Sequence, residues 1–180
     1  MIKLLILDID GVLTNGRKIY NLDGDCVYKE YCDRDFTAIK KFKAIGINVC
    51  FLSGDAAVNE KMAELRKVDF YLSRDKKSNL ISKASFIPVF EETYNCKSTD
   101  MIYVGDDIFD LDIIKKVKYS YCPAGSDLHV LKNVNKVLSA KSGDHVVQCL
   151  FETMMQDGLI EDADEDKIKI LDSQERVKYA

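Results

Sequence analysis

Two aspartates near the start of the chain have the spacing of a reactive acidic pair. Asp8 and Asp10 follow directly on a nearly continuous apolar run over residues 2–7. In an extended segment, side chains two positions apart point the same way, so the two carboxylates should converge. Like charges this close favour retention of a proton or binding of a cation, and Mg²⁺ prefers hard oxygen ligands. The pair therefore indicates acid-base or metal chemistry, although aspartates that only form a turn after a strand fit the same short motif.

A second acidic segment follows the apolar run over residues 101–104. Gly105 is followed by Asp106 and Asp107, and Asp110 stands four positions after Asp106. A cluster of carboxylates behind a strand is a credible magnesium site. Acidic residues also favour the N-terminus of a helix. That alternative applies mainly to Asp107 and Asp110, whose part in a metal shell stays open.

Two further segments could bind phosphate. Ser53 and Gly54 follow the apolar run over residues 47–52, and a hydroxyl with exposed N–H groups at a strand-to-helix turn can bind phosphate oxygens. Lys76 and Lys77 precede a predicted helix and offer compact positive charges for phosphoryl oxygens. Each segment also has a plainer interpretation, Ser53 as a helix N-cap and the lysines as a solvated basic pair.

The elements that would position these residues alternate between strands and helices. Apolar runs typical of strands buried on both faces of a parallel sheet lie at residues 2–7, 47–52, 70–72, 101–104 and 119–122. Segments with helical spacing lie at residues 36–46, 58–68, 78–90, 107–117 and 146–155. This alternation predicts an α/β fold with a doubly wound, mostly parallel, Rossmann-like sheet. Ligands bind such sheets at the carboxyl ends of the strands.

Two segments depart from this alternation. Residues 17–31 contain two short β-prone stretches around an Asp-Gly turn, which predicts a β-hairpin flap where a helix would be expected. Residues 161–166 are almost all acidic, so residues 159–180 are predicted to form a flexible tail. Residues 1–158 should then form a single domain.

Composition narrows the function classes. The 180 residues are 47% apolar, enough for one sizeable core. The net charge of −4 provides no basic surface for nucleic acid. The apolar run at residues 2–7 is too short for a signal peptide or a membrane span, and six cysteines without C-x-x-C spacing favour free thiols in a reducing compartment. We therefore expect a cytoplasmic protein that binds neither nucleic acid nor membrane.

Together the four motifs resemble those of the haloacid dehalogenase-like (HAD) superfamily. By that resemblance Asp8 is the nucleophile and Asp10 the general acid/base, because a second aspartate at this place points to phosphatases and phosphomutases rather than dehalogenases. Ser53 and Lys76 would hold the transferring phosphoryl group. Asp8, Asp106 and the backbone carbonyl of Asp10 would bind Mg²⁺. The resemblance implies a HAD-type sheet and a phosphoric monoester hydrolase.

The resemblance covers about residues 2–155 and refines two points. Lys76 is favoured over Lys77 because Leu80, four residues after Lys76, fits the K-x-x-x-L pattern of the superfamily. The segments between the first three motifs hold one hairpin, two helices and one strand, and leave no room for the cap domain that most members carry. A capless enzyme must take a macromolecular substrate or close its site with a neighbouring subunit, since phosphoryl transfer benefits from exclusion of water.

The segment from residue 10 to residue 16, followed by a hairpin, resembles more closely the 3-deoxy-D-manno-octulosonate 8-phosphate phosphatase family. That family includes phosphatases of sialic-type sugar acids and the C-terminal domain of some cytidylyltransferases. The resemblance implies a homotetramer whose hairpins close neighbouring sites, and a phosphorylated ulosonic or sialic-type sugar acid, or a related sugar phosphate, as substrate. Candidate substrate contacts are Thr14, Asn15, Gly16, Gly54 and Arg34.

Several positions depart from that family. Phe36 stands where Gly is usual, Asp55 replaces an arginine after Ser-Gly, and residues 142–149 keep only traces of a C-terminal pattern rich in Gly that includes Arg. These departures leave the eight-carbon substrate open, and they support a second hypothesis, a non-catalytic oligomerisation or regulatory module. A response-regulator receiver is disfavoured, because its acceptor Asp ends the third strand and the strand at residues 70–72 is followed by no acid at that point.

Overall fold

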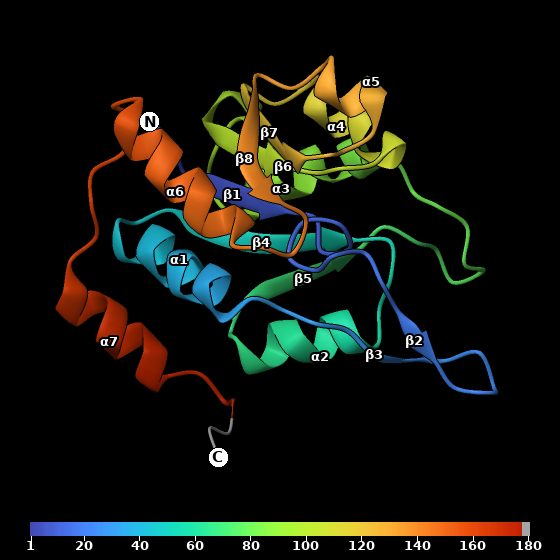
Figure 1. Ribbon diagram of the computed structural model, residues 1–180. Coiled ribbons are helices and arrows are strands. Elements are labelled where there is room, and N and C mark those ends of the chain that lie inside the picture. Colours follow the sequence, from blue (N-terminus) through green and yellow to red (C-terminus); the bar gives the residue numbers. More distant parts are fainter. Residues whose placement is uncertain (178–180) are drawn as a thin grey trace.

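A parallel sheet between layers of helices forms the centre of the molecule (Figure 1). The computed structural model describes residues 1–177, and within them this sheet has six strands in the order β5-β4-β1-β6-β7-β8. Every neighbouring pair is parallel. The strands are β1 Leu4–Leu7, β4 Asn48–Ser53, β5 Asp69–Leu72, β6 Met101–Val104, β7 Tyr119–Ala124 and β8 Lys136–Lys141. The predicted doubly wound α/β fold is confirmed, and its switch point lies between β1 and β6.

Strand β1 is buried on both faces. Leu5 and Leu7 belong to one apolar cluster and Leu4 and Ile6 to the other, and all four side chains are fully buried. The continuous apolar run reflects this position, because a central strand of a parallel sheet meets a helical layer on each side.

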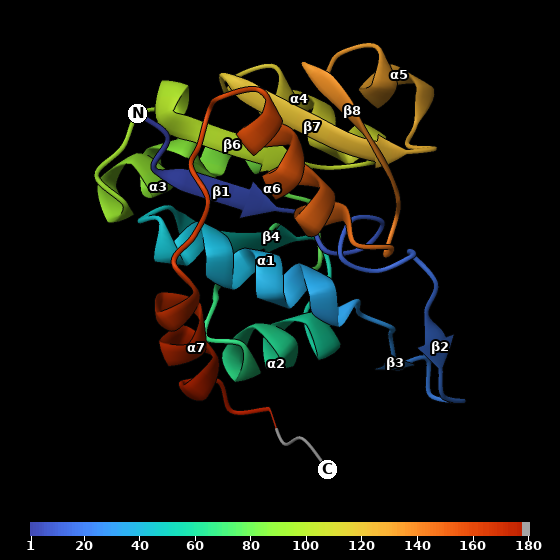
Figure 2. The same cartoon turned by 60° about the vertical axis from the view of Figure 1, so that its left-hand side comes forward.

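Helices α1 and α6 lie side by side over one face of the sheet, where the Phe42 and Phe151 rings meet edge to face at 5.0 Å (Figure 2). Helices α3 and α4 belong to the cluster on the other face. Their bounds are α1 Asp33–Ala44, α2 Val58–Leu65, α3 Ile87–Thr93, α4 Leu111–Ile114, α5 Leu128–Leu131 and α6 Val146–Gln156, with 3₁₀ turns at η1 Lys83–Phe86, η2 Ser98–Asp100 and η3 Ile108–Asp110. Over residues 1–177, none of the helices combines the length and apolarity needed to cross a bilayer.

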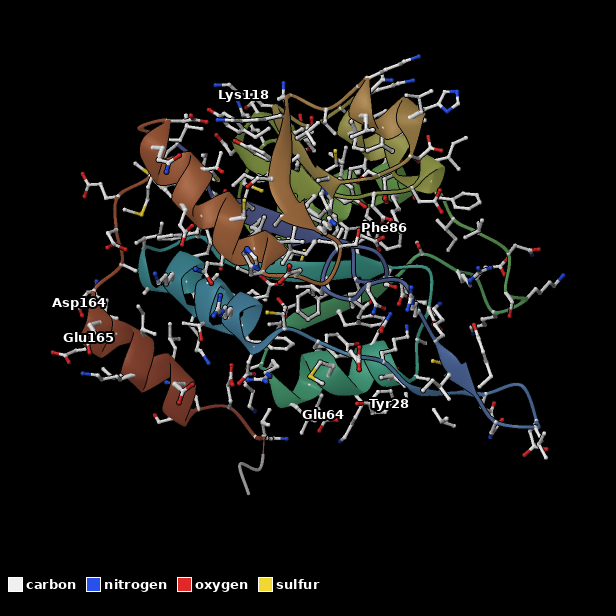
Figure 3. The ribbon with its side chains drawn as sticks, in the orientation of Figure 1. Tyr28, Glu64, Phe86, Lys118, Asp164 and Glu165 are labelled. Atoms are coloured by element: carbon white, nitrogen blue, oxygen red, sulfur yellow. The ribbon has the colours of Figure 1, made fainter. Side chains whose placement is uncertain are left out.

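The predicted hairpin consists of β2 (Ile19–Tyr20) and β3 (Cys26–Tyr28), which pair antiparallel and project away from the sheet (Figure 1). It carries several apolar side chains into solvent, and each of them is more than half exposed: Ile19, Tyr20, Leu22, Val27 and Tyr28. Tyr28 is labelled in Figure 3, at the base of this hairpin. A two-stranded ribbon with this surface gains little stability by itself in water.

The helix predicted over residues 78–90 begins later than expected. Residues 73–82 form a loop, and regular helical structure starts at Lys83. Within the loop the Asp75 carboxylate accepts the backbone N–H groups of Lys77 and Asn79, each at 2.8 Å. Such a local side-chain bond offers the backbone an alternative to the helix. The later start changes which lysine opens the helical segment.

The structure also differs from the prediction of a flexible tail over residues 159–180. Residues Glu165–Ser173 form helix α7, which packs beside α1 (Figure 2). The Asp164 side chain caps its N-terminus (Figure 3), and the Lys40 ammonium of α1 lies 2.6 Å from the Asp172 carboxylate. The acidic run therefore supplies a cap and favourable first-turn charges, and basic side chains of the domain neutralise the helix. The last three residues of the predicted tail lie outside the described residues.

Candidate active site

A cleft of about 1020 Å³ lies at the carboxyl ends of the strands. Its walls come from the ends of β1 and β4, the hairpin, the loop after β5 and the acidic loop after β6. Asp8, Asp10, Ser53 and Gly54 line it. Segments far apart in the sequence meet here because parallel strands end at one edge of the sheet.

Asp8 and a lysine face each other in the floor of the cleft. The Lys83 ammonium lies 3.0 Å from the Asp8 Oδ1 atom, and both side chains are less than a tenth exposed. Burial raises the pKa of Asp8 to about 7, although the charge of Lys83 opposes that shift. Burial alone would lower the pKa of Lys83, but Asp8 and Asp110 outweigh it and raise that pKa. Lys83 therefore stays charged beside a carboxylate that could act as a nucleophile.

Asp110 holds this arrangement from behind. Its Oδ1 accepts from the Lys83 ammonium at 2.6 Å and from the Tyr103 hydroxyl at 2.5 Å. Its Oδ2 accepts the backbone N–H groups of Asp106 and Asp107 at 2.9 and 3.1 Å. Four donors occupy the two oxygens of a fully buried carboxylate. Asp110 therefore orients Lys83 and the acidic loop.

In the acidic loop after β6, the Asp106 carboxylate has a buried oxygen that is not satisfied by the described residues. Its Oδ1 is buried and accepts no hydrogen bond among the described residues. Burial, and then the charges of Asp8, Asp110 and Asp107, raise its pKa to about 8. One oxygen each of Asp8, Asp106 and Asp110 lie within 4.8 Å of one another. A buried oxygen without a donor, beside a second carboxylate, suits a small divalent cation with a preference for oxygen ligands.

Gly11 leaves the space that this carboxylate needs. A Cβ atom at Gly11 would lie 2.0 Å from Asp106 Oδ2, and the glycine has a φ of +94°. Any other residue would be strained at this φ and would also displace the Asp106 carboxylate. The loop after β1 therefore brings its backbone against the acidic loop, as a site shared by both segments requires.

Ser53 is fixed at the end of β4. It is buried, and its Oγ accepts hydrogen bonds from Asn59 Nδ2 at 3.0 Å and from the backbone N–H of Asp55 at 3.1 Å. Since a hydroxyl has two acceptor sites and one donor, its own proton remains for a phosphoryl oxygen. Asn59, on α2, was not predicted from the sequence, because an asparagine inside a helical pattern carries no local signal of a site.

Several known proteins similar to this chain are phosphatases of a sugar acid phosphate. No protein-family model matches the chain. The 3-deoxy-D-manno-octulosonate 8-phosphate phosphatase KdsC of Haemophilus influenzae is 29% identical over 157 residues, which cover 86% of this chain and 83% of that protein. KdsC of Salmonella typhi is 32% identical over 136 residues, which cover 72% of this chain and 65% of that protein. The cobalt-bound structure of the Haemophilus influenzae phosphatase has a TM-score of 0.78 at 26% identity, over 86% of this chain and 88% of that chain.

The chain is thus KdsC-like in sequence and in fold, and the similarity supports a capless haloacid dehalogenase-like protein. Its lysine motif, however, lies elsewhere than predicted. Lys76 is exposed in the loop after β5 and is not among the residues that line the cleft, whereas Lys83 contacts Asp8. The K-x-x-x-L pattern with Leu80 misled the prediction, because the loop continues to residue 82 and the helical segment starts at Lys83. The local sequence signal for Lys83 was its position at the very start of the helical segment.

The predicted substrate contacts divide into two groups. Gly54 lines the cleft, whereas Thr14, Asn15, Gly16 and Arg34 do not. Thr14 is fully buried, and its hydroxyl accepts the N–H of Gly16 at 3.2 Å, so it supports the loop after β1. Arg34 is exposed on α1, and Asn15 and Gly16 are exposed in the loop after β1. Within one chain these four residues do not form the wall of the cleft.

Asp10 contacts residues that lie outside the four sequence motifs of this chain. Its carboxylate lies 2.8 Å from the Lys29 ammonium, and it accepts from Asn59 Nδ2 at 3.1 Å. Asp55, at the position of the usual arginine, also faces the cleft and pairs with Lys18 at 2.8 Å and with Lys29 at 2.9 Å. Burial alone would raise the pKa of Asp55, but hydrogen bonds from these two lysines lower it. A lone lysine between aromatic residues of a β-prone stretch was the only sequence signal for Lys29.

Proposed function

We propose that this protein is a Mg²⁺-dependent phosphatase of a phosphorylated sugar acid or a related sugar phosphate, and that it acts through a phosphorylated Asp8. One observation carries the proposal. The Asp8 carboxylate lies in the floor of the cleft with the Lys83 ammonium 3.0 Å away, and the unpartnered Asp106 carboxylate lies beside it. The KdsC relatives, named as phosphatases of a sugar acid phosphate, support the same reaction and substrate class.

In the first half-reaction the Asp8 carboxylate attacks phosphorus and the bond to the leaving oxygen breaks. Lys83 and the Ser53 hydroxyl hold the phosphoryl oxygens and neutralise the charge that develops on them. Asp10 gives its proton to the leaving oxygen, so that the product leaves as a neutral alcohol. The acyl phosphate on Asp8 remains.

In the second half-reaction water attacks the phosphorus of this acyl phosphate. Asp10, now deprotonated, takes a proton from the water, and Asp8 is released as a carboxylate. Asp8, Asp106 and the backbone carbonyl of Asp10 would hold Mg²⁺. When bound, the ion supplies positive charge for the phosphoryl oxygens and offsets the repulsion between the nucleophile and its substrate.

The substrate class rests on the relatives and on the shape of the cleft. The volume of about 1020 Å³ exceeds what a phosphate alone requires, so there is space for a sugar-sized leaving group. Asp55 stands where the 3-deoxy-D-manno-octulosonate 8-phosphate phosphatase family usually has an arginine, so this position offers no positive charge to a substrate carboxylate. A panel of sugar phosphates and ulosonic acid phosphates, assayed for free phosphate with Mg²⁺, therefore decides the substrate. Turnover of simple sugar phosphates with none of any ulosonic acid phosphate would exclude the sugar-acid part of the proposal.

The decisive variant is Asp8→Asn, which keeps the shape of the side chain and removes the nucleophile. We expect it to abolish Mg²⁺-dependent release of phosphate from an aryl phosphate, a loss comparable to removal of an activated nucleophile, on the order of 10⁴-fold or more. Asp166→Asn, which removes an exposed aspartate on α7, is the matched control and should retain full activity. Unchanged hydrolysis by Asp8→Asn would refute the mechanism. No turnover of any ester by the unaltered protein would favour the non-catalytic module.

We also propose that the protein is a cytoplasmic homotetramer in which hairpins close neighbouring sites. The support is the set of exposed apolar side chains on β2 and β3, and the elements within residues 1–177 include no separate cap domain over the cleft. A partner surface on the hairpin would bury this area, which favours association.

A further inference from the structure

Lys29 is the most completely enclosed cation next to the cleft. Its side chain is fully buried. The ammonium lies 2.8 and 2.9 Å from the two carboxylate oxygens of Asp10, 2.9 Å from Asp55 Oδ2 and 2.8 Å from Asn59 Oδ1. An ammonium has three N–H donors, so these four oxygens occupy all of them. A lysine held in this way has one position, unlike a solvated lysine on a flexible stem.

The partners of Lys29 hold Asp10 from a second side. The Asn59 amide donates to Asp10 Oδ2 at 3.1 Å, while its carbonyl oxygen accepts from Lys29 and from the Tyr31 hydroxyl at 2.9 Å. The same amide donates to Ser53 Oγ at 3.0 Å. The Asp10 carboxylate is therefore held by the Lys29 ammonium, which contacts both of its oxygens, and by the Asn59 amide, which is itself fixed by further hydrogen bonds.

The lysines that contact Asp10 lie at the two ends of the hairpin. Lys29 directly follows β3, and Lys18 directly precedes β2. Lys18 lies 2.8 Å from Asp55 and 3.4 Å from Asp10. The two ends of the hairpin thus attach to the same two aspartates, and the two lysines and two aspartates form one cluster. Any displacement of the hairpin base would move the Asp10 carboxylate with it.

We propose that Lys29 is a positioning residue for Asp10. The position of the hairpin base, which carries Lys29, would then determine the orientation of the Asp10 carboxylate. The inference rests on the proposed function. An acid/base must lie within hydrogen-bond reach of the oxygen it serves, and a misplacement of about 1 Å can cost about 10²-fold in rate. Without Lys29 the Asp10 carboxylate would keep Asn59 as a partner but would lose the group that spans its two oxygens.

The leaving group of the substrate distinguishes positioning from general structural damage. In Lys29→Met we expect kcat/KM for a sugar phosphate, whose alcohol leaves poorly without a proton, to fall by about 10²-fold. The value for 2,4-dinitrophenyl phosphate should change little, because its phenolate leaves without protonation and kcat/KM reports only the steps up to that departure. The variant should also accumulate phosphorylated Asp8, since the second half-reaction needs Asp10 as base.

Lys61→Met is the matched control, because Lys61 is an exposed lysine on α2 whose one ion pair within residues 1–177 is with exposed Glu64, at 2.8 Å. This variant should leave kcat/KM for both substrates unchanged. Equal losses for the two substrates in Lys29→Met, or no loss with the sugar phosphate, would overturn the inference. If Lys29→Met does not fold, Lys29→Gln replaces it, because Gln keeps an N–H donor without the charge. The same comparison then applies, namely the loss in kcat/KM for the sugar phosphate against the loss for 2,4-dinitrophenyl phosphate. An unaltered protein that hydrolyses neither ester refutes the proposed function and the inference with it, whereas an active protein with equal losses refutes the inference alone.

Discussion

Binding of Mg²⁺ should depend strongly on pH, because the cation has to displace protons from two of its ligands. In the metal-free protein the pKa of Asp8 is about 7 and that of Asp106 about 8, against 3.8 for an ordinary aspartate. Both values are raised, so the protons on these groups stabilise the folded state. That contribution is complete below about pH 4 and is lost as the pH rises through about 7 and 8.

The size of the effect follows from these two pKa values. Between pH 8 and pH 6 the deprotonated fraction of Asp8 falls about 10-fold and that of Asp106 about 50-fold. If both must be deprotonated to hold the ion, the apparent affinity for Mg²⁺ should fall by between about 10² and 10³-fold over this interval, and binding at pH 6 should release about two protons.

Thermal unfolding and calorimetry measure both quantities. The melting temperature of the metal-free protein should fall as the pH rises from 6 to 9, and the increase produced by a fixed concentration of Mg²⁺ should grow over the same range. Titration calorimetry in buffers of different ionisation enthalpy counts the protons released. Asp106→Asn should abolish the response to Mg²⁺. Asp107→Asn, which removes the same charge from an exposed neighbour that contacts Ile108 N–H, should largely keep it.

Two outcomes would refute this reasoning. A Mg²⁺ affinity that stays constant between pH 6 and pH 9 would show that Asp8 and Asp106 are not the groups that exchange protons for the ion. A full response to Mg²⁺ in Asp106→Asn would place the ion outside the Asp8 and Asp106 pair.

Two further predictions concern the lysine and the hairpin. Lys83→Met should remove activity and destabilise the fold by about 3–5 kcal/mol at neutral pH, because Asp8 and Asp110 would lose their buried partner. Lys76→Met should retain both activity and stability. Equal effects of the two variants on phosphate release and on urea unfolding would contradict the assignment of Lys83 as the phosphate-binding lysine. Light scattering should give a mass about four times the 20.5 kDa of one chain, and Val27→Asp, which places a charge on the half-exposed apolar face of the hairpin, should lower that mass; a monomer in the unaltered protein would exclude the tetramer.

The strand-end acids and their order could be predicted from the sequence because their signals are local. Asp8 and Asp10 follow a short apolar run that favours a buried strand, and Ser53 and Asp106 follow two more such runs. Chain-local periodicity identifies a strand, and the topology of parallel sheets then brings all strand ends to one edge. The fold class and the gathering of the strand-end acids at one edge of the sheet followed from these two steps, whereas the lysine in the floor of the cleft did not.

Loop length and long-range pairing could not be predicted in the same way. Lys76 and Lys83 both precede apolar helical segments, and a side-chain turn at Asp75 decides that the helix starts at the second. The choice depends on a competition between a local hydrogen bond and helix formation, and the pattern of apolar residues does not report it. Helix α7 is a similar case, because its partners are more than a hundred residues away in the sequence.

The sequence alone predicted which acids we propose as the reactive groups, since their identity and their place after apolar runs can be read from consecutive residues. Only the tertiary structure decided which cations serve those acids. Lys83 reaches Asp8 from the start of a helical segment on the far side of a long loop, and Lys29 reaches Asp10 from the hairpin. The physical reason is that the strand before each acid brings that acid to the edge of the sheet, whereas a lysine at the end of a flexible stem can reach an acid only where the fold brings distant segments together.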